Sequence, residues 1–167
     1  MNPEFRRALS SDMSRLTEIY NQYVAGSHVS FDMDAWTVEQ RVEWFSTKRT
    51  DGVHQVWVAT IEGELAGAAW SGAWRAKEAY ERSVETTVVL DEAWTGRRIG
   101  PGLLGTLLGA ITKAGAHRAY AIVALPNVAS IAMHHRLGYR TVGTLDEVGY
   151  KMGRWWATEI LEKKLEG

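Results

Sequence analysis

The sequence VETTVVLDEAWTGRRIGPGLLGTLLGAI, residues 84–111, decides how the rest of the chain is organised. Residues 84–90 are rich in β-branched side chains and have the length of a strand. The helix expected after them has an apolar stripe at Ile99, Leu103, Leu107 and Ile111. Glycines stand in the turn between the two. Because the first N–H groups of a helix are unpaired and carry partial positive charge, we expect this turn to hold the phosphates of a cofactor.

Charge is distributed unevenly, although the formal net charge is −1. Residues 93–145 contain no Asp or Glu. The basic residues of this block are Arg97, Arg98, Lys113, Arg118, Arg136 and Arg140. A solvated basic face is one interpretation. Binding of a polyanionic ligand is the interpretation we favour.

The composition bounds the class of protein. A chain of 167 residues with 46% hydrophobic residues is expected to form a single domain over residues 1–167. The absence of cysteine excludes disulfides, thiolate metal sites and a cysteine nucleophile. The five scattered histidines give no metal-ligand spacing. No apolar run approaches the ~18 residues that cross a bilayer, and the first residues lack the apolar core of a secretion signal, so we expect a cytoplasmic protein.

Periodicity and turn residues place the remaining elements. Strands are expected at residues 5–8, 55–61, 65–74, 84–90, 119–125, 139–144 and 148–161, and helices at 10–24, 37–49, 99–111 and 127–138. In the second helix, Val38, Val42 and Phe45 are expected to face inward. Residues 162–167 are expected to form a frayed tail. This order of elements predicts an α/β fold with one mixed sheet and helices on both faces.

Two familiar nucleotide-binding patterns do not fit. Residues 100–105 spell G-x-G-x-x-G. A dinucleotide site needs an acidic residue about 20 positions further on, and none occurs between this motif and Asp146. The sequence has no G-K-[ST], which excludes a P-loop, and no G-x-S-x-G elbow for a serine nucleophile.

Glu85 is the one acid on the central strand, where it shares a face with Thr87 and Val89. Loss of water around a carboxylate disfavours its charged form and raises its pKa toward that of a useful base. A solvated Glu at a strand end is the simpler alternative. Of His134 and His135, one is expected to face inward and the other outward, and a structural role for the inward histidine remains open.

The segment that enters the central strand carries Arg75, Lys77 and Tyr80. Arginine can hold a substrate carboxylate with two hydrogen bonds and lysine as a point charge, and surface charges on a loop are the equal alternative. Phe31 and Trp74 are expected to line the same pocket or to belong to the core.

Five pieces of sequence together resemble the GCN5-related N-acetyltransferase (GNAT) superfamily, and more narrowly the phosphinothricin N-acetyltransferase family, over roughly residues 5–161. They are WRAKEAY, VETTVVL, TGRRIGPGLL, ALPNVASIAMHHRLGYRTVGTL and VGYKMGRW. The resemblance implies a seven-stranded mixed sheet that is splayed open between strands 84–90 and 119–125. It also implies that the pantetheine arm of acetyl-CoA lies in that gap, and that such enzymes are cytoplasmic homodimers.

The resemblance also assigns roles to residues. Backbone groups of Val88, Val89 and Leu90 would pair with pantetheine, and Asn127 would bind it. The pyrophosphate would bind the turn made by Gly96, Arg97, Arg98, Ile99, Gly100 and Pro101, in which Arg98 stands where the family has glycine. Glu85 matches the general base, and His134 a catalytic or site-lining histidine. Arg75, Lys77 and Tyr80 match the region that binds the substrate carboxylate.

These observations predict an acetyl-CoA-dependent N-acetyltransferase without a metal. The acceptor would be the primary amine of a small amino acid or analogue, such as phosphinothricin, methionine sulfone or methionine sulfoximine, and Glu85 would remove its proton. The alternative is a non-catalytic acyl-CoA-binding module, which the substituted turn favours. A nucleic-acid binder fits poorly, because the net charge is −1 and exposed aromatic residues do not alternate with basic ones.

Overall fold

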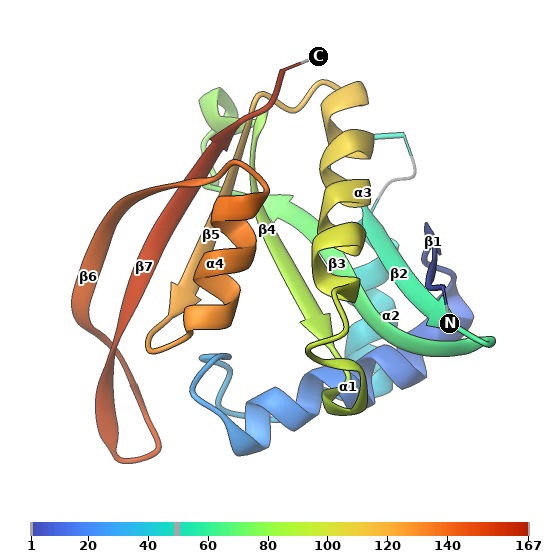
Figure 1. The fold of residues 1–167 in the computed structure, drawn as a ribbon, viewed down its shortest axis with the longest axis horizontal. Coiled ribbons are helices and arrows are strands. Elements are labelled where there is room, and N and C mark those ends of the chain that lie inside the picture. Colours follow the sequence, from blue (N-terminus) through green and yellow to red (C-terminus); the bar gives the residue numbers. More distant parts are fainter. Residues whose placement is uncertain (1, 49–50, 167) are drawn as a thin grey trace.

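The computed structural model describes residues 2–48 and 51–166, which form one seven-stranded sheet in the order β1-β2-β3-β4-β5-β7-β6 (Figure 1). The strands are β1 Glu4–Arg7, β2 Val56–Ile61, β3 Glu64–Ala73, β4 Ser83–Leu90, β5 Arg118–Ala124, β6 Arg140–Lys151 and β7 Arg154–Lys164. Only β4 and β5 pair in parallel, and all other neighbours are antiparallel. The predicted α/β fold with one mixed sheet is confirmed.

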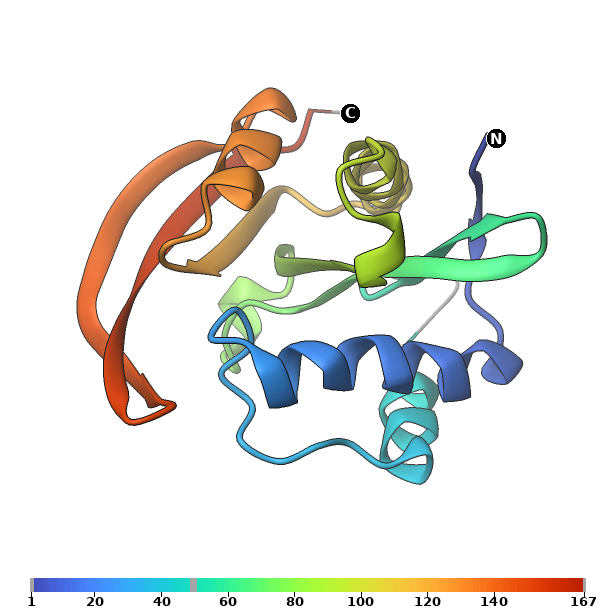
Figure 2. The ribbon, with the colours of Figure 1, turned by 60° about the horizontal axis from the view of Figure 1, so that its bottom comes forward.

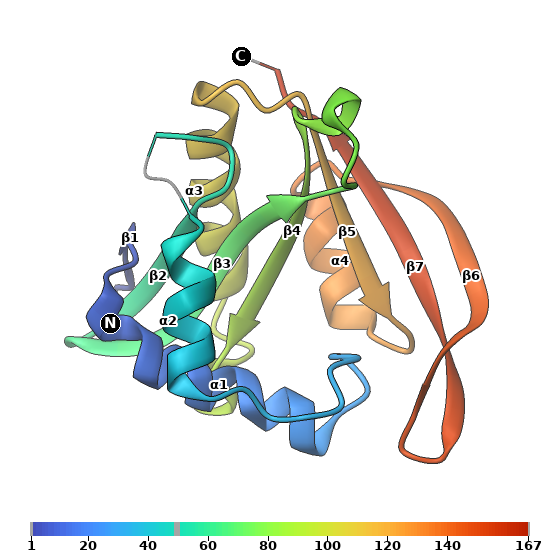
Figure 3. The ribbon, with the colours of Figure 1, turned by 180° about the vertical axis from the view of Figure 1, so that it is seen from behind.

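Helices cover both faces of the sheet (Figures 2 and 3). They are α1 Met13–Gly26, α2 Val38–Ser46, α3 Ile99–Lys113 and α4 Val128–Arg136, with short 3-10 turns at Ser10–Asp12, Glu78–Tyr80 and Glu92–Trp94. One core lies between α3 and the sheet, and a smaller core lies between α1, α2 and the opposite face. No helix within the described residues is long and apolar enough to cross a membrane.

The unit formed by β4 and α3 is the predicted one. The stripe residues Ile99, Leu103, Leu107 and Ile111 are buried against the sheet. Alternate β4 side chains point to opposite faces, as expected for a strand. Val84 and Val88 join the core under α3, whereas Val89 joins the core under α1 and α2. Glu85 therefore faces the side of α1 and α2.

The sheet forks at its centre. β4 pairs with β5 only through Ser83, Val84 and Glu85, which lie opposite residues 118–120. Beyond this point β4 continues alongside β3, and β5 continues alongside β7. The two strands diverge toward their C-terminal ends (Figure 1). The first arm of the fork is β1–β4 and the second arm is β5, β7 and β6, so the implied splaying is confirmed.

The closing hairpin differs from the prediction. The expected break near residues 145–147 is not a turn but an irregularity within β6, where the pairing register shifts between Leu145 and Gly149. Glu147 takes a positive φ of 49° there, which absorbs the extra residues. The turn is Met152-Gly153, with φ values of 54° and 76°. The expected tail was also wrong, because β7 continues to Lys164 and Leu165 is buried.

The inward face of α2 was predicted correctly at Phe45, which packs against the smaller core, but wrongly at the two valines. Val38 and Val42 are 38% and 41% exposed, whereas Arg41 is 1% exposed. The guanidinium carbon of Arg41 lies 4.1–5.9 Å from the ring centroids of four aromatic residues: Tyr20, Trp36, Trp44 and Trp70. This favourable contact between a cation and ring faces turns the helix so that Arg41 points inward. Residue 49, the expected end of this helix, and residue 167 of the expected tail lie outside the described residues.

Candidate active site

Glu85 lies at the branch point of the fork. It is the last residue of β4 that pairs with β5, opposite Tyr120, and on its other side it pairs with Gly72 of β3. The side chain is partly buried, and this burial raises the pKa of Glu85, while the positive charge of Arg75 acts in the opposite direction. A carboxylate in this position can accept a proton from a group that enters the fork. The structure thus places Glu85 in a partly buried position and not in a fully solvated one.

Aromatic and basic side chains surround this carboxylate from both arms. Trp74, which follows β3, stacks on Tyr120 of β5 with ring centroids 4.2 Å apart and an interplanar angle of 15°. The guanidinium carbon of Arg75 lies 4.7 Å from the centroid of the Trp74 ring. Arg75 is the cation whose charge acts on Glu85, so the structure brings together Glu85, Trp74 and Arg75.

The opposite face of the fork carries His134. Thr86, next to Glu85 on β4, donates from Oγ1 to the carbonyl of Tyr120 at 3.0 Å, and its Oγ1 lies 2.7 Å from the hydroxyl of Tyr139. The Tyr139 ring makes an edge contact with His134 at 4.9 Å between centroids. Burial raises the pKa of the Tyr139 hydroxyl, so it stays protonated. A chain of contacts therefore leads from β4 to the inward histidine of α4.

His134 is 3% exposed, and its two ring nitrogens differ. Nδ1 lies 2.8 Å from the carbonyl oxygen of Ser130. Because a carbonyl can only accept, Nδ1 carries the hydrogen of this bond and Nε2 keeps a lone pair. Nε2 is buried and has no hydrogen-bond partner among the described residues. Burial lowers the pKa of His134, so the ring is neutral near pH 7.

The glycine-containing turn leads into α3 with unusual backbone angles. Gly96 and Arg98 both have positive φ, 73° and 61° respectively. Glycine adopts this conformation freely, whereas other residues lose about 1–2 kcal/mol in it. Arg98 therefore occupies a position where glycine would be relaxed. The turn, the first N–H groups of α3 and the basic side chains of Arg97 and Arg98 together suit a polyanionic ligand.

Further hydrogen bonds fix the end of β4 on the first arm and the start of α4 on the second arm. The hydroxyl of Tyr23 on α1 donates to the carbonyl of Leu90 at 2.5 Å, and Arg15 pairs with Asp91. These contacts fix the end of β4 against α1. On the second arm, Asn127 caps α4 by accepting a hydrogen bond from the N–H of Ser130 at 3.1 Å. Capping uses Oδ1, which leaves its amide NH₂ group to meet a ligand.

The other predicted residues lie farther apart along the surface. Lys77 and Tyr80 belong to the exposed connection between β3 and β4, where the N–H of Tyr80 donates to the carbonyl of Lys77 at 2.9 Å. Phe31 lies in the loop between α1 and α2, and its ring contacts Gly149 of β6. The structure therefore places Phe31 on a different element from the group formed by Glu85, Trp74 and Arg75.

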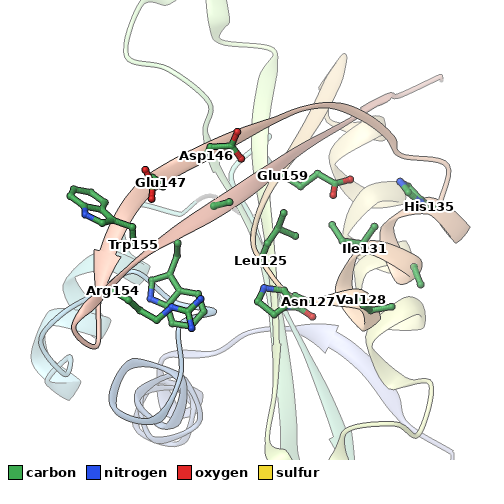
Figure 4. A pocket seen from close by; sticks show the side chains of 14 residues that line it. Leu125, Asn127, Val128, Ile131, His135, Asp146, Glu147, Arg154, Trp155 and Glu159 are labelled. Atoms are coloured by element: carbon green, nitrogen blue, oxygen red, sulfur yellow. The ribbon is translucent and has the colours of Figure 1, made fainter.

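A cavity of about 940 Å³ lies between α4 and the β6–β7 hairpin, beyond the end of β5. Figure 4 shows Val128 and Ile131 of α4 on one side and Asp146, Glu147 and Trp155 of the β6–β7 hairpin on the other. It includes Asn127, but neither Glu85 nor His134 belongs to its lining. We therefore do not regard this cavity as the place of reaction.

Sequence reasoning missed two residues of this region. Tyr23 was expected only as a core or interface residue of the helix over residues 10–24, and Tyr139 only as the start of a strand. Tyr139 meets Thr86 across a separation of 53 positions. No local pattern marks such a contact, because it arises only when α4 and β4 are packed together.

Within residues 2–48 and 51–166, no group of three or more His, Asp or Glu side chains could hold a metal ion.

Comparisons with known proteins agree with this geometry. Residues 14–139 match the model of the acetyltransferase (GNAT) family. The phosphinothricin N-acetyltransferase of Streptomyces coelicolor is 41% identical over 97% of this chain and 96% of its own length. The L-methionine sulfoximine/L-methionine sulfone acetyltransferase of Salmonella typhimurium is 29% identical over 96% of this chain and 94% of its own.

Solved structures agree as well. A GNAT superfamily phosphinothricin acetyltransferase from Sinorhizobium meliloti, crystallised in complex with acetyl-CoA, superimposes with a TM-score of 0.94 at 30% identity, over 99% of this chain and 89% of that one. The chain therefore belongs to the acetyltransferase (GNAT) family, and within it to the phosphinothricin N-acetyltransferase-like enzymes.

Proposed function

We propose that this protein transfers the acetyl group of acetyl-CoA to the primary amine of a small amino acid or analogue, of the phosphinothricin, methionine sulfone or methionine sulfoximine type. We propose one catalytic domain over residues 1–167, acting in the cytoplasm, where acetyl-CoA is available. The observation that carries the proposal is the partly buried carboxylate of Glu85 at the branch point of the fork. The names of the relatives support this substrate class.

The donor site suits acetyl-CoA, which supplies an activated thioester when bound. Val88, Val89 and Leu90 lie on the part of β4 that no longer pairs with β5, so backbone groups on that edge can pair with the pantetheine arm. The turn from Gly96 to Pro101 would hold the pyrophosphate at the start of α3. Asn127 would donate its amide to pantetheine from the second arm.

Glu85 is proposed as the general base. An amine is protonated at neutral pH and has no lone pair until a proton leaves. A carboxylate whose pKa is raised by burial accepts that proton more readily than a solvated one. The neutral nitrogen can then attack the thioester carbonyl, while the fork holds the two reactants in register. The N–C bond forms as the C–S bond breaks, and CoA leaves as a thiolate that takes up the second proton lost by the nitrogen.

His134 is proposed as a second catalytic group, on the side of the fork opposite Glu85. Its unprotonated Nε2 is buried without a partner among the described residues, which suits it to accept a proton or a hydrogen bond from a reacting group. Replacing His134 with Phe keeps a ring of similar size but removes this acceptor. We expect kcat to fall more than tenfold, with acetyl-CoA affinity within twofold of the wild type. If His134→Phe releases CoA with the kcat of the wild type, His134 is a structural residue and not a catalytic one.

Arg75 is proposed to bind the carboxylate of the acceptor, with Lys77, Tyr80, Trp74 and Phe31 contributing to the pocket. For Arg75→Ala we expect the KM for amino-acid acceptors to rise about tenfold, because a charge-assisted hydrogen bond is lost, equivalent to ~1.4 kcal/mol.

The same change should shift the acidic limb of the kcat/KM profile to higher pH. Arg75 lowers the pKa of Glu85, so its loss raises that pKa, and the base is protonated over a wider range. Arg82→Ala is the control, since Arg82 lies in the same connection but does not act on Glu85. If Arg75→Ala changes neither the acidic limb of the kcat/KM profile nor the KM for amino-acid acceptors, Arg75 does not belong to the acceptor pocket.

A thiol-release assay tests the activity itself. Acetyl-CoA is offered with phosphinothricin, methionine sulfone, methionine sulfoximine, polyamines or a peptide N-terminus. We expect release of CoA with one or more of the three amino-acid analogues. Acetyl-CoA binding without release for any amine would favour the acyl-CoA-binding module instead.

We also propose a homodimer formed through the β6–β7 hairpin and α4. Large apolar side chains are exposed there: Val128, Val142, Leu145, Val148, Tyr150, Met152 and Trp155. A patch of this kind on a monomer marks an interaction surface. The surface carries Arg154 as well as Asp146 and Glu147, so a twofold copy can supply opposite charges. Sedimentation equilibrium should give twice the mass of one chain, and a monomer at micromolar concentration would contradict the proposal.

A further inference from the structure

The loop of residues 27–36, here called the strap, joins α1 to α2 and reaches both arms of the fork. α1 packs on the first arm, where Leu16 and Ile19 join the core with β2 and β3. From the end of α1 the strap extends toward the tip of the β6–β7 hairpin (Figures 2 and 3). His28 of the strap lies 3.1 Å from the carbonyl oxygen of Pro126, which follows β5. The strap therefore spans the open end of the fork, on the face of the sheet that carries Glu85.

Lys151 holds the strap from the second arm. This lysine is the last residue of β6 and is 4% exposed. Its Nζ donates to the carbonyl of Val24 at 2.8 Å and to the carbonyl of Ser30 at 2.7 Å. One ammonium group thus joins the C-terminal end of α1 to the middle of the strap.

The carbonyl of Val24 lies in the last turn of α1, where a positive charge is favourable. The last four carbonyls of a helix lack partners within the helix, and that end carries partial negative charge. The last turn of α1 contains no basic residue of its own. Lys151 supplies the missing charge from a strand more than a hundred residues away in the sequence. Burial lowers the pKa of Lys151, while the negative charge of Asp32 in the strap acts in the opposite direction.

Two other contacts of the hairpin act on the strap beside Lys151. The ring of His28 stacks on Trp156 with centroids 4.1 Å apart, and Trp156 donates from Nε1 to the carbonyl of Lys151 at 2.8 Å. Phe31 follows Ser30 directly, and its ring lies so close to Gly149 that a Cβ added there would be 2.6 Å from Phe31 Cζ. The position of Phe31 is therefore set by the same hairpin.

We propose that Lys151 is a positioning residue for the acceptor amine. It acts indirectly, by holding the strap, and with it Phe31, across the open end of the fork. The inference rests on the proposed acetyl transfer. An acceptor that is to reach Glu85 must enter on the face covered by α1, α2 and the strap. The hydrogen bonds of Lys151 determine where that wall stands.

The chemistry of the site favours this role over simple packing. An ammonium loses hydration when it is buried, which opposes folding, and a methionine of similar length would fill the same space without that loss. What lysine alone provides is donors for two carbonyls that belong to different parts of the chain. Those bonds fix the middle of a loop in which Phe31 and Met33 are 38% and 65% exposed, so burial of these two side chains contributes little to its position.

Lys151→Met tests the inference, with Lys164→Met as the matched control on the exposed end of β7. We expect the KM for the amino-acid acceptor to rise at least tenfold in Lys151→Met, while the KM for acetyl-CoA stays within twofold. Amide hydrogen exchange of residues 27–32 should accelerate at least tenfold in this variant. Lys164→Met should change none of these quantities.

His28→Ala covers the case in which Lys151→Met does not fold. It removes the stacking on Trp156 at a partly exposed position, and we expect the acceptor KM to rise at least threefold with acetyl-CoA KM unchanged. An unchanged acceptor KM in each of these variants that folds, even with a lowered melting temperature, would overturn the proposal. Because the assay uses whichever amine the wild type acetylates, absence of any wild-type turnover would instead refute the proposed function.

Discussion

Replacing Glu85 with Gln should lower kcat by about 10²- to 10⁴-fold, the range expected when a general base is lost. The amide keeps the size of the carboxylate but cannot accept a proton from the acceptor amine. Acetyl-CoA affinity, measured by calorimetry, should stay within twofold, because the turn before α3 and the free edge of β4 do not include this side chain. Turnover equal to the wild type at neutral pH would refute the role of Glu85.

The pH profile and the stability of the variant provide its controls. In the wild type, kcat/KM should rise with pH as Glu85 loses its proton, with a midpoint above the ordinary glutamate value, since burial raises this pKa. His134 contributes no competing limb near neutral pH, because burial lowers its pKa. The residual activity of Glu85→Gln should lack the acidic limb.

Stability should respond in the opposite direction to activity. A carboxyl group with a raised pKa in the folded chain stabilises the fold below its unfolded pKa, and that contribution is lost as pH rises through the folded pKa. The amide introduced by Glu85→Gln never ionises. At pH 7 the variant should therefore melt at the wild-type temperature or higher in calorimetry, so a loss of turnover cannot be attributed to unfolding.

Replacing Gly67 with Ala should destabilise the fold and weaken acetyl-CoA binding together. Gly67 pairs with Leu90, and an added Cβ would overlap the carbonyl oxygen of Val89 and lie 3.0 Å from the Cα of Leu90. Both are backbone atoms, so β4 itself must move. Overpacking of this kind costs about 1–3 kcal/mol, which corresponds to a fall in melting temperature of roughly 2–12 °C for a chain of this size.

The loss of affinity follows from the place of the clash. Val89 and Leu90 form the part of β4 that is free to pair with pantetheine, so its displacement should raise the dissociation constant for acetyl-CoA at least tenfold. Gly109→Ala is the control, because nothing lies within 4 Å of a Cβ added there. An exposed helical glycine replaced by alanine should gain about 0.5–1 kcal/mol. Equal melting temperatures for Gly67→Ala and the wild type would show that β3 and β4 are not held this closely.

Local sequence determined the central unit of this protein. The β-branched run of β4, the glycines after it and the apolar stripe of α3 act over neighbouring residues, and they folded as predicted because strand and helix periodicities are local properties. The face on which Glu85 lies followed from the same periodicities, as did the expectation that one of His134 and His135 points inward, and the structure shows that it is His134. Of the six basic residues in the acid-free block, Arg97 and Arg98 lie in the turn itself, whereas Lys113 lies at the opposite end of α3.

Tertiary structure decided what periodicity could not. Arg41 faces inward only because aromatic rings from α1, α2, β3 and the strap surround it, and the two valines expected to be buried are exposed instead. Lys151 lies in the sequence within the strand expected over residues 148–161 and has no predicted role, yet its Nζ donates to the carbonyls of residues 24 and 30. Such partners meet only after the sheet has formed, because their interaction depends on distance in space and on the water excluded by packing.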